Sequence, residues 1–227
     1  MKFIFPVGLA ILSLIGCAGP KAPPQILNAI HENRVASIAC LPVKKILYSQ
    51  LVYKVLYNET VTSTSDFTGL WDIDSALSKQ WSEILDHLKI KNQVLSELIS
   101  TESLNALCRD CPRGKTKKAN LPKEIQKVLL ENHISNLLLL RFGLPYLLST
   151  TMIPSGSIHL IGDLRFLNVQ TNKEDFSEQI NLTTQPHYGS SPKNIEANDL
   201  LIFKSSIRDM MENGETKVFK PIFQIEK

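Results

Sequence analysis

The most compact chemical motif of the chain is Cys108-Arg-Asp-Cys111, which places two thiols three positions apart. A reduced pair with this spacing carries out thiol–disulfide exchange when it opens a helix that follows a strand, because the helix N-terminus stabilises the thiolate. Here the residues before the motif have a helical pattern, while Pro112 and Gly114 after it break regular structure. We therefore predict a disulfide between Cys108 and Cys111, with redox activity, zinc binding and free thiols as alternatives.

Zinc binding would need further ligands around this cysteine pair. A structural zinc site usually has about four protein ligands. The further donors that could be recruited are Cys40 and one of His87, His133 or His159. The sequence contains no second pair of closely spaced cysteines. We expect neither a metal nor a cofactor.

The signatures of common catalytic sites are missing from the sequence, including H-E-x-x-H, G-x-S-x-G, the phosphate-binding loop and G-x-G-x-x-G. The polar loop at residues 184–195 contains His187 and a pair of serines, but a nucleophile also needs an orienting partner and oxyanion donors. We predict that the protein is not an enzyme. The alternative is a periplasmic thiol-redox or hydrolytic enzyme that uses Cys108 and Cys111 or the 184–195 loop.

Basic residues crowd the segment that follows the cysteine motif. This cluster could meet lipopolysaccharide phosphates, anionic lipid or an acidic protein surface, or it could be a solvated loop. The residues that we predict to bind a partner are Arg113, Lys115, Lys117 and Lys118, and Lys123 lies nearby.

The N-terminus has the pattern of an exported protein. Lys2 is followed by an apolar run to Ile15, which as a helix would span only about 20 Å, short of the roughly 30 Å hydrocarbon core. We therefore expect residues 1–16 to be a signal peptide. Leu14-Ile15-Gly16-Cys17 resembles the lipobox of bacterial lipoproteins, in which the cysteine is acylated after cleavage; an ordinary buried cysteine is the alternative reading.

The residues after Cys17 predict how the protein is held at the membrane. Several acyl chains together give a permanent anchor, and the proline-rich segment that completes residues 17–25 predicts a semi-rigid tether. Ala18 stands where an aspartate would favour inner-membrane retention in enterobacterial sorting. We therefore expect an outer-membrane lipoprotein that faces the periplasm, with the inner membrane or the cell surface as alternatives.

Composition indicates an ordinary globular protein. The formal net charge is +3, or +2 once Lys2 has been removed with the signal peptide, and 43% of the residues are hydrophobic. This near-neutral balance gives no case for a nucleic-acid partner. We expect residues 26–227 to form one periplasmic domain.

Hydrophobic periodicity predicts a mixture of strands and helices. Helices are expected where apolar residues recur at intervals of three and four positions, and strands where apolar residues alternate with polar ones or form short runs. The expected helices are 72–89, 93–107, 122–132 and a helix through Leu200, Phe203, Ile207 and Met210. The expected strands are 35–43, 51–58, 134–142, the hairpin 158–170 with 175–183, and an edge strand at 218–225. This order predicts an α/β or α+β fold with a mixed sheet covered by helices.

Four segments carry a diffuse resemblance to a known family: SIACLPV, LVYKVLYN, ENHISNLLLLRF and IHLIGDLRFLNVQTNKEDFSEQI. Together they look like periplasmic lipoproteins of the curli-secretion-channel and penicillin-binding-protein-activator type, whose anticodon-binding-like domain also resembles the amino-terminal domain of TolB. The resemblance covers residues 35–212 as a pattern, with Phe176 near the family's aromatic position. It implies a non-enzymatic accessory or assembly factor that binds an envelope protein complex, and it carries over no functional residue.

Overall fold

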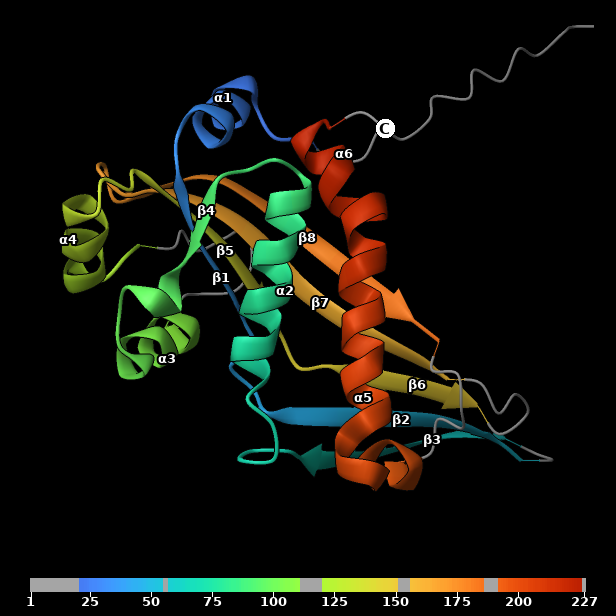
Figure 1. Ribbon diagram of the computed structural model, residues 1–227. Coiled ribbons are helices and arrows are strands. Elements are labelled where there is room, and N and C mark those ends of the chain that lie inside the picture. The colour runs from blue at the N-terminus through green and yellow to red at the C-terminus, as the bar shows by residue number, and fades with distance from the viewer. Residues whose placement is uncertain (1–20, 55–56, 111–119, 151–155, 186–191, 226–227) are drawn as a thin grey trace, which may run out of the picture.

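The computed structural model describes residues 21–54, 57–110, 120–150, 156–185 and 192–225. Within these ranges the chain forms one mixed parallel and antiparallel sheet flanked by helices, as the sequence predicts (Figure 1). The strands are β1 Val35–Cys40, β2 Lys45–Tyr53, β3 Asn58–Asp66, β4 Asn92–Val94, β5 Asn136–Phe142, β6 Tyr146–Thr150, β7 Ser157–Asn168 and β8 Lys173–Thr184. Their order across the sheet is β3-β2-β6-β7-β5-β1-β4, and β8 also pairs with β7.

The helices form a layer on each face of the sheet. They are α1 Pro24–Glu32, α2 Ile73–His87, α3 Thr101–Asp110, α4 Lys123–Glu131, α5 Pro192–Gly214 and α6 Lys220–Phe223. Buried residues of α1, α2, α5 and α6 share one core, while those of α3 and α4 belong to a second core on the opposite face. A π-helical turn at Glu215–Phe219 joins α5 to α6.

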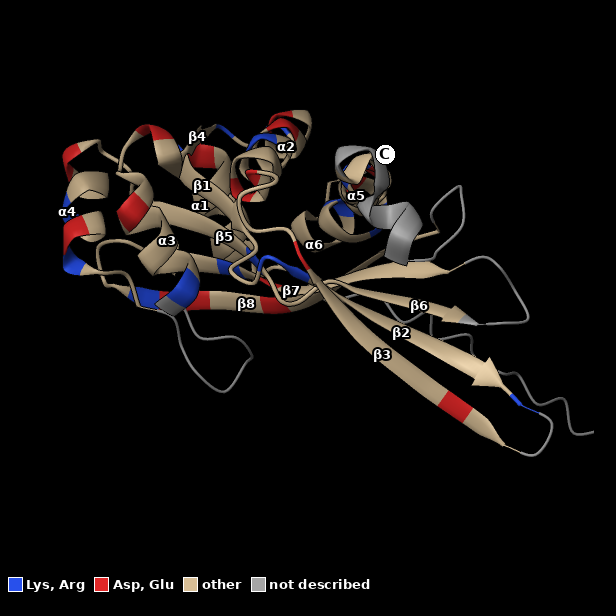
Figure 2. Ribbon diagram, turned by 90° about the horizontal axis from the view of Figure 1, so that it is seen from below, with Lys and Arg blue, Asp and Glu red and all other residues tan. Residues whose placement is uncertain are grey.

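The sheet divides into two parts along β7. One part of β7 pairs antiparallel with β5 and its N-terminal end pairs with β6, while β1 lies parallel to β5 and β2 parallel to β6. Short breaks that contain Pro42 and Pro145 separate β1 from β2 and β5 from β6, because proline cannot donate a ladder hydrogen bond. We call β2, β3 and β6 the arm. Figure 2 shows the arm extending away from α3 and α4.

Gly162 allows the strands to approach closely where β5 ends. A Cβ atom at this position would lie 2.6 Å from the carbonyl oxygen of Arg141 and 2.7 Å from Cδ1 of Phe142. Next to it, the backbone N–H of Gly143 donates to the carbonyl of Ile161 at 2.8 Å. A residue without a side chain is therefore required on β7 at the boundary between the body of the sheet and the arm.

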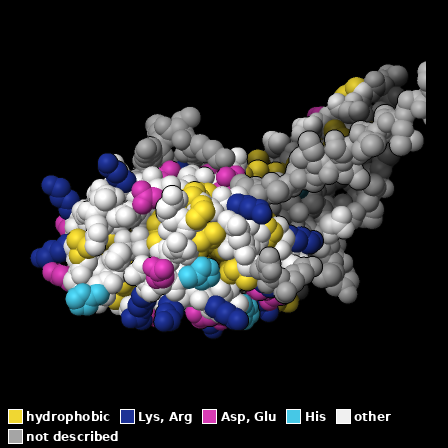
Figure 3. Space-filling view, turned by 90° about the horizontal axis from the view of Figure 1, so that it is seen from above, with side chains coloured by type: hydrophobic (Ala, Val, Ile, Leu, Met, Phe, Trp, Pro, Cys, Tyr) yellow, Lys and Arg dark blue, Asp and Glu magenta, His cyan; other side chains and the backbone are white. Residues whose placement is uncertain are grey.

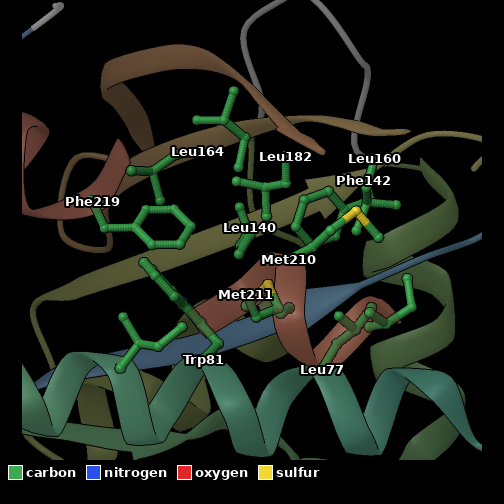
Figure 4. Close-up of a cluster of buried hydrophobic side chains, with 14 of the residues drawn as sticks. Leu77, Trp81, Leu140, Phe142, Leu160, Leu164, Leu182, Met210, Met211 and Phe219 are labelled. Carbon is green, nitrogen blue, oxygen red and sulfur yellow. The ribbon is translucent and has the colours of Figure 1, made fainter. Parts of the chain in front are cut away.

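The first core fills the space between the sheet and the helices α2, α5 and α6. Figure 4 shows Trp81 and Leu77 of α2 facing Leu140 and Leu164 of the sheet. The ring of Trp81 lies 4.8 Å from that of Phe219, centroid to centroid. Aromatic side chains bury large apolar areas, so this pair contributes strongly to the stability of the layer.

The N-terminal end of the described chain is bound to the C-terminal end. The N–H of Ala22 donates to the carbonyl of Ile222 at 2.8 Å, and the side-chain amide of Gln224 donates to the carbonyl of Ala22 at 3.0 Å. Helix α1 then begins at Pro24, where a proline suits the first turn. The predicted tether at 17–25 is therefore wrong for its last residues, which belong to the folded domain.

Several elements confirm the sequence prediction. The helix expected at 72–89 is α2, and Asp72 caps it by accepting a hydrogen bond from the N–H of Ser75 at 3.2 Å. The helix expected at 122–132 is α4 and follows Pro122. The strands expected at 35–43 and 134–142 are β1 and β5, and the predicted hairpin is β7 with β8.

Other predictions of elements are wrong. The expected edge strand at 218–225 is helical, because Phe219, Ile222 and Phe223 recur at helical spacing and all face the first core. The helix expected at 93–107 begins only at Thr101, after β4 and a short 3-10 turn. The strand expected at 51–58 is β2, which starts and ends earlier. The sequence analysis did not predict α1, β3 or β6.

Candidate interaction surface

Among the described residues, Cys40 of β1 and Cys108 of α3 form a disulfide, and their Cα atoms lie 6.1 Å apart. The predicted pairing of Cys108 with Cys111 is therefore wrong, and Cys111 itself lies outside the described residues. Cys108 faces the sheet from α3, and the carbonyl of the same residue accepts a hydrogen bond from Nε of Arg141 at 2.7 Å. The local turn that a Cys108–Cys111 bond would need is absent at Cys108, because α3 continues to Asp110.

The position of this disulfide argues against thiol–disulfide exchange at Cys108. Cys40 is fully buried and Cys108 is 3% exposed, so both sulfurs lie inside the second core. A thiolate that attacks a disulfide needs access to one of its sulfurs. Across the described ranges, no group of three or more His, Cys, Asp or Glu residues could hold a metal ion. The bond therefore acts as a structural link between α3 and the sheet.

A serine and a histidine lie together at the base of the arm. Ser157 Oγ lies 2.7 Å from Nε2 of His159, whose ring stacks on Tyr146 with centroids 4.7 Å apart. A catalytic histidine needs an orienting group on its other nitrogen, but Nδ1 of His159 is buried and has no hydrogen-bond partner among the described residues. The pair lacks the geometry of a hydrolase. His187, which the sequence analysis considered, lies in the segment 186–191, outside the described residues.

The buried histidine gives a testable pKa prediction. Burial lowers the pKa of His159, so its NMR titration midpoint is expected below the ordinary value of about 6.5. Because the fold favours the neutral ring, this group stabilises the protein above about pH 6.5, and that stability is lost as the pH falls through the folded-state pKa. A midpoint at or above the ordinary value would contradict the prediction.

His87 serves as an internal control in the same titration. It lies on α2, with Nδ1 3.0 Å from the carboxylate of Glu215, whose hydrogen bond raises the pKa of His87. Its midpoint is therefore expected to move in the opposite direction, above the ordinary value. Replacing Glu215→Gln should return His87 towards that value and leave His159 unchanged.

A small polar hollow of about 200 Å³ lies between α2 and α3, and its acidic residues already have structural roles. Asp72 caps α2. Asp74 accepts a hydrogen bond from the N–H of Leu41 at 2.8 Å and pairs with Lys44 at 2.5 Å. These carboxylates position the end of β1 against α2, so they are engaged within the fold.

A buried ion cluster on β7 and β8 is also structural. Arg165 is fully buried, with Nη1 2.9 Å from the carboxylate of Glu174 and Nη2 3.7 Å from that of Asp163. A buried charge must be paired to be tolerated. The cluster places charges where the strand pattern alone would predict apolar residues.

The predicted basic cluster falls outside the described residues, because Arg113, Lys115, Lys117 and Lys118 belong to the segment 111–119. Lys123, at the start of α4, is exposed. Figure 3 views the end of the molecule that carries α1 and α6, and its basic and acidic side chains are interspersed there. The described surface in that view therefore shows no large patch of one charge.

The arm gathers exposed apolar side chains. Tyr53 is 40% exposed, Tyr57 58%, Val61 48% and Leu148 42%. Lys45, Glu59 and Asp66 are the charged residues of β2, β3 and β6, so the arm is mostly tan in Figure 2. Tyr53 and Leu148 share one face of the arm, whereas Val61 pairs with Gln50 and lies on the other face. Apolar side chains exposed close together mark surfaces that contact other molecules.

One face of the arm is also hollowed. Ile46 and Tyr48 face the first core, so the alternate residues Ser49 and Leu51 point to the opposite face. The strand register places Thr62, Ser49, Leu148 and Ser157 in one row across the strands. A hollow of about 430 Å³ follows this row; its lining is Ser49, Leu51, Thr60, Leu148, Ser149, Gly156, Ser157 and Gln185.

The turn at the tip holds β2 against β3. The N–H of Lys54 donates to the carbonyl of Tyr57 at 2.9 Å, and the ammonium group of Lys54 lies 5.0 Å from the centroid of the Tyr57 ring. Lys54 Nζ also pairs with Glu59 at 2.5 Å. These contacts hold Tyr57 beside the end of β2. The sequence analysis missed this surface, although the alternation around Tyr53 indicated a strand.

No protein-family profile matches the chain, and no curated protein matches it. Among solved structures, the chain is similar to the 1.65 Å structure of the hypothetical protein CT253 from Chlamydia trachomatis. The two share 15% sequence identity with a TM-score of 0.43, over 82% of this chain and 94% of that chain. A similarity of this strength assigns neither a family nor a function. No helix in the described part of the chain is long and apolar enough to span a membrane.

Proposed function

We propose that the protein is a lipid-anchored accessory or assembly factor of the bacterial cell envelope, and that it binds an envelope protein through the arm. The observation that carries the proposal is the group of exposed apolar side chains of the arm and its tip, Tyr53, Tyr57 and Leu148. Interfaces concentrate binding energy in a few anchors, and tyrosine is enriched among them. Tyr53 and Tyr57 are therefore the expected anchors.

The position of the arm suits an anchored protein. Under the proposal Cys17 is acylated and the outer membrane holds the chain, which reaches the folded domain at Ala22. Ala22 is bound to α6. In Figure 1, α1 and α6 lie at the top of the molecule, whereas β2 and β3 lie at the bottom. The arm would thus face away from the point where the tether enters the domain.

The enzymatic alternative has weaker support. Cys108 is buried and bonded to Cys40, and the Ser157–His159 pair has no orienting carboxylate within the described ranges. We therefore propose a binding role that involves no catalysis.

The test is to remove the apolar anchors of the arm. We expect the combined change Tyr53→Ser, Tyr57→Ser and Leu148→Ser to lower the recovery of crosslinked envelope proteins at least about tenfold, because each hot-spot side chain typically contributes about 2 kcal/mol or more. Crosslinking in the native envelope followed by affinity capture and mass spectrometry measures the recovery.

A matched control uses Leu130→Ser on α4, because Leu130 is 42% exposed but lies far from the arm in the chain's fold. Exposed substitutions usually change stability by about 0.5 kcal/mol or less, so both variants should melt like the natural protein. A Cys17→Ser chain tests the anchor separately and should leave the membrane fraction. Equal recovery of the same partners by the arm variant and by the control would refute the proposed function.

A further inference from the structure

Within the described ranges, strand β3 has no strand partner on one of its two sides. It pairs with β2 over its whole length, from Lys45↔Asp66 to Tyr53↔Asn58, and the register shows no shift. It is also the terminal strand of the sheet order, so no described strand pairs with its other side. A row of backbone N–H and C=O groups along nine residues is therefore available at this edge.

The sequence of β3 lacks the features that usually prevent edge-to-edge pairing. Such features are lysine or proline on the edge strand, a β-bulge, or a short strand. The strand NETVTSTSD contains no lysine and no proline, and its charges, Glu59 and Asp66, lie near its two ends. All residues from Thr60 to Thr64 are exposed and uncharged.

The other edges of the sheet do carry such protection. Strand β4 has only three residues. Strand β8 begins with the charged segment Lys173-Glu174-Asp175, and its pairing with β7 has a register shift at Phe166/Leu167. The unprotected edge is thus specific to β3.

We propose that β3 pairs antiparallel with β3 of a second copy of this chain, across a two-fold axis at Thr62. This register places Thr60 opposite Thr64, and Val61 opposite Ser63, from the other copy. Thr62 is the middle residue of β3, so this is the register in which all nine residues of both strands are paired. Threonine pairs directly opposite one another stabilise antiparallel strands.

The charges at the ends of β3 favour a second copy. In the proposed register Glu59 lies opposite Ser65 and Asp66 opposite Asn58, so no like charges are opposed. Each acidic residue is also paired within its own arm: Asp66 with Lys45 at 3.7 Å, and Glu59 with Lys54 at 2.5 Å. Two identical arms could therefore meet edge to edge without repulsion between carboxylates.

This pairing is independent of the proposed function. It uses the backbone edge of β3 and leaves the hollowed face around Ser49 and Leu148 exposed. A dimer would place two such faces side by side on one continuous sheet. The arm could bind an envelope partner as a monomer, and the dimer could form without that partner.

The experiment uses cysteine crosslinking of the full chain in the native envelope, with Cys111→Ser as the background. Thr62→Cys is expected to give a disulfide-linked dimer as the main species after mild oxidation, because position 62 faces its own copy. Thr60→Cys and Thr64→Cys are the matched controls. Each is expected to give less than a tenth of that dimer, since a residue two positions from the axis lies about 13 Å from its own copy.

Co-expression gives a second, positive test of the register. Chains with Thr60→Cys and Thr64→Cys in the same cell should form the crosslinked dimer that neither forms alone. A charge swap tests the same register in chains that carry a distinguishing tag. Thr62→Lys should abolish their dimers, and a mixture of Thr62→Lys and Thr62→Glu chains should restore them.

Three results would overturn the inference. They are equal crosslinking at positions 60, 62 and 64, no crosslinked dimer at position 62, and crosslinking of position 62 mainly to a different protein. The last result would support a heterologous partner on this edge. Loss of partner recovery in the Tyr53, Tyr57 and Leu148 variant does not depend on any of these outcomes.

Discussion

Replacing Cys40 with alanine is expected to lower the free energy of unfolding by about 3–4 kcal/mol. The bond between Cys40 and Cys108 joins residues 68 positions apart, and in the chain-entropy account a loop of this length restricts the unfolded chain by about 4 kcal/mol. The bond also fixes α3 to β1 inside the second core. Urea unfolding of the oxidised protein, followed by circular dichroism, measures the change.

Substitutions of the three cysteines distinguish the Cys40–Cys108 bond from a Cys108–Cys111 bond. Cys108→Ala should destabilise the protein as much as Cys40→Ala, and the double variant should cost little more than either alone, because one bond is lost in each case. Cys111→Ala is the matched control and should leave the unfolding midpoint nearly unchanged. A large loss of stability in Cys111→Ala with none in Cys40→Ala would show that Cys108 pairs with Cys111 instead.

Trp81→Ala is expected to lower the free energy of unfolding by about 3–5 kcal/mol, as large-to-small changes of buried aromatic residues do. Trp81 is fully buried on α2 and packs against Phe219 of the π-helical turn. Its loss would leave a cavity between α2 and the C-terminal helices, where Figure 4 shows the Trp81 side chain between α2 and Phe219. Equilibrium unfolding in urea tests the value.

Two further variants separate packing from the polar atom of the indole. Nε1 of Trp81 is buried without a hydrogen-bond partner in the described part of the chain, so Trp81→Phe should cost only about 1–2 kcal/mol, since no partner is left unsatisfied. Trp71→Ala is the control, because Trp71 is only half-buried and meets Phe203 edge-on at 5.8 Å. If Trp71→Ala destabilises the protein as much as Trp81→Ala, the assignment of Trp81 to the centre of the core is wrong.

The two proposals give the arm different tasks. The exposed tyrosines at the tip suit an envelope partner, whereas the Thr-rich edge of β3 suits a second copy. The side chains concerned belong to adjacent strands, and the backbone of β2 is already paired with β3. An assembly factor that uses both would present two partner-binding faces from one dimer.

Local pattern was sufficient for several elements of the fold. Helix α2 follows from apolar residues at threes and fours after the capping residue Asp72, and α4 follows from the same spacing after Pro122. The hairpin of β7 and β8 follows from two strand-like runs on either side of a polar turn. In each case, neighbouring residues in the sequence carry the signal, so the mixed α/β fold could be predicted without tertiary contacts.

Long-range contacts decided the remaining features. Strand β3 is polar and exposed, so it has no buried face to give it a periodicity, and only its pairing with β2 makes it a strand. The segment 218–225 is rich in Val, Ile and Phe, which are common in strands, yet contacts of Phe219 and Phe223 with the first core make it helical.

The cysteine pairing and the candidate surface depend on the same kind of contact. Cys108 pairs with Cys40 because α3 packs on β1, a contact between segments far apart in the chain. The arm becomes a surface only when the breaks at Pro42 and Pro145 separate it from the body of the sheet. The sequence by itself determined the class of fold, while the export signal stays a prediction. The pairing of distant segments, which local periodicity does not encode, decided where binding residues lie.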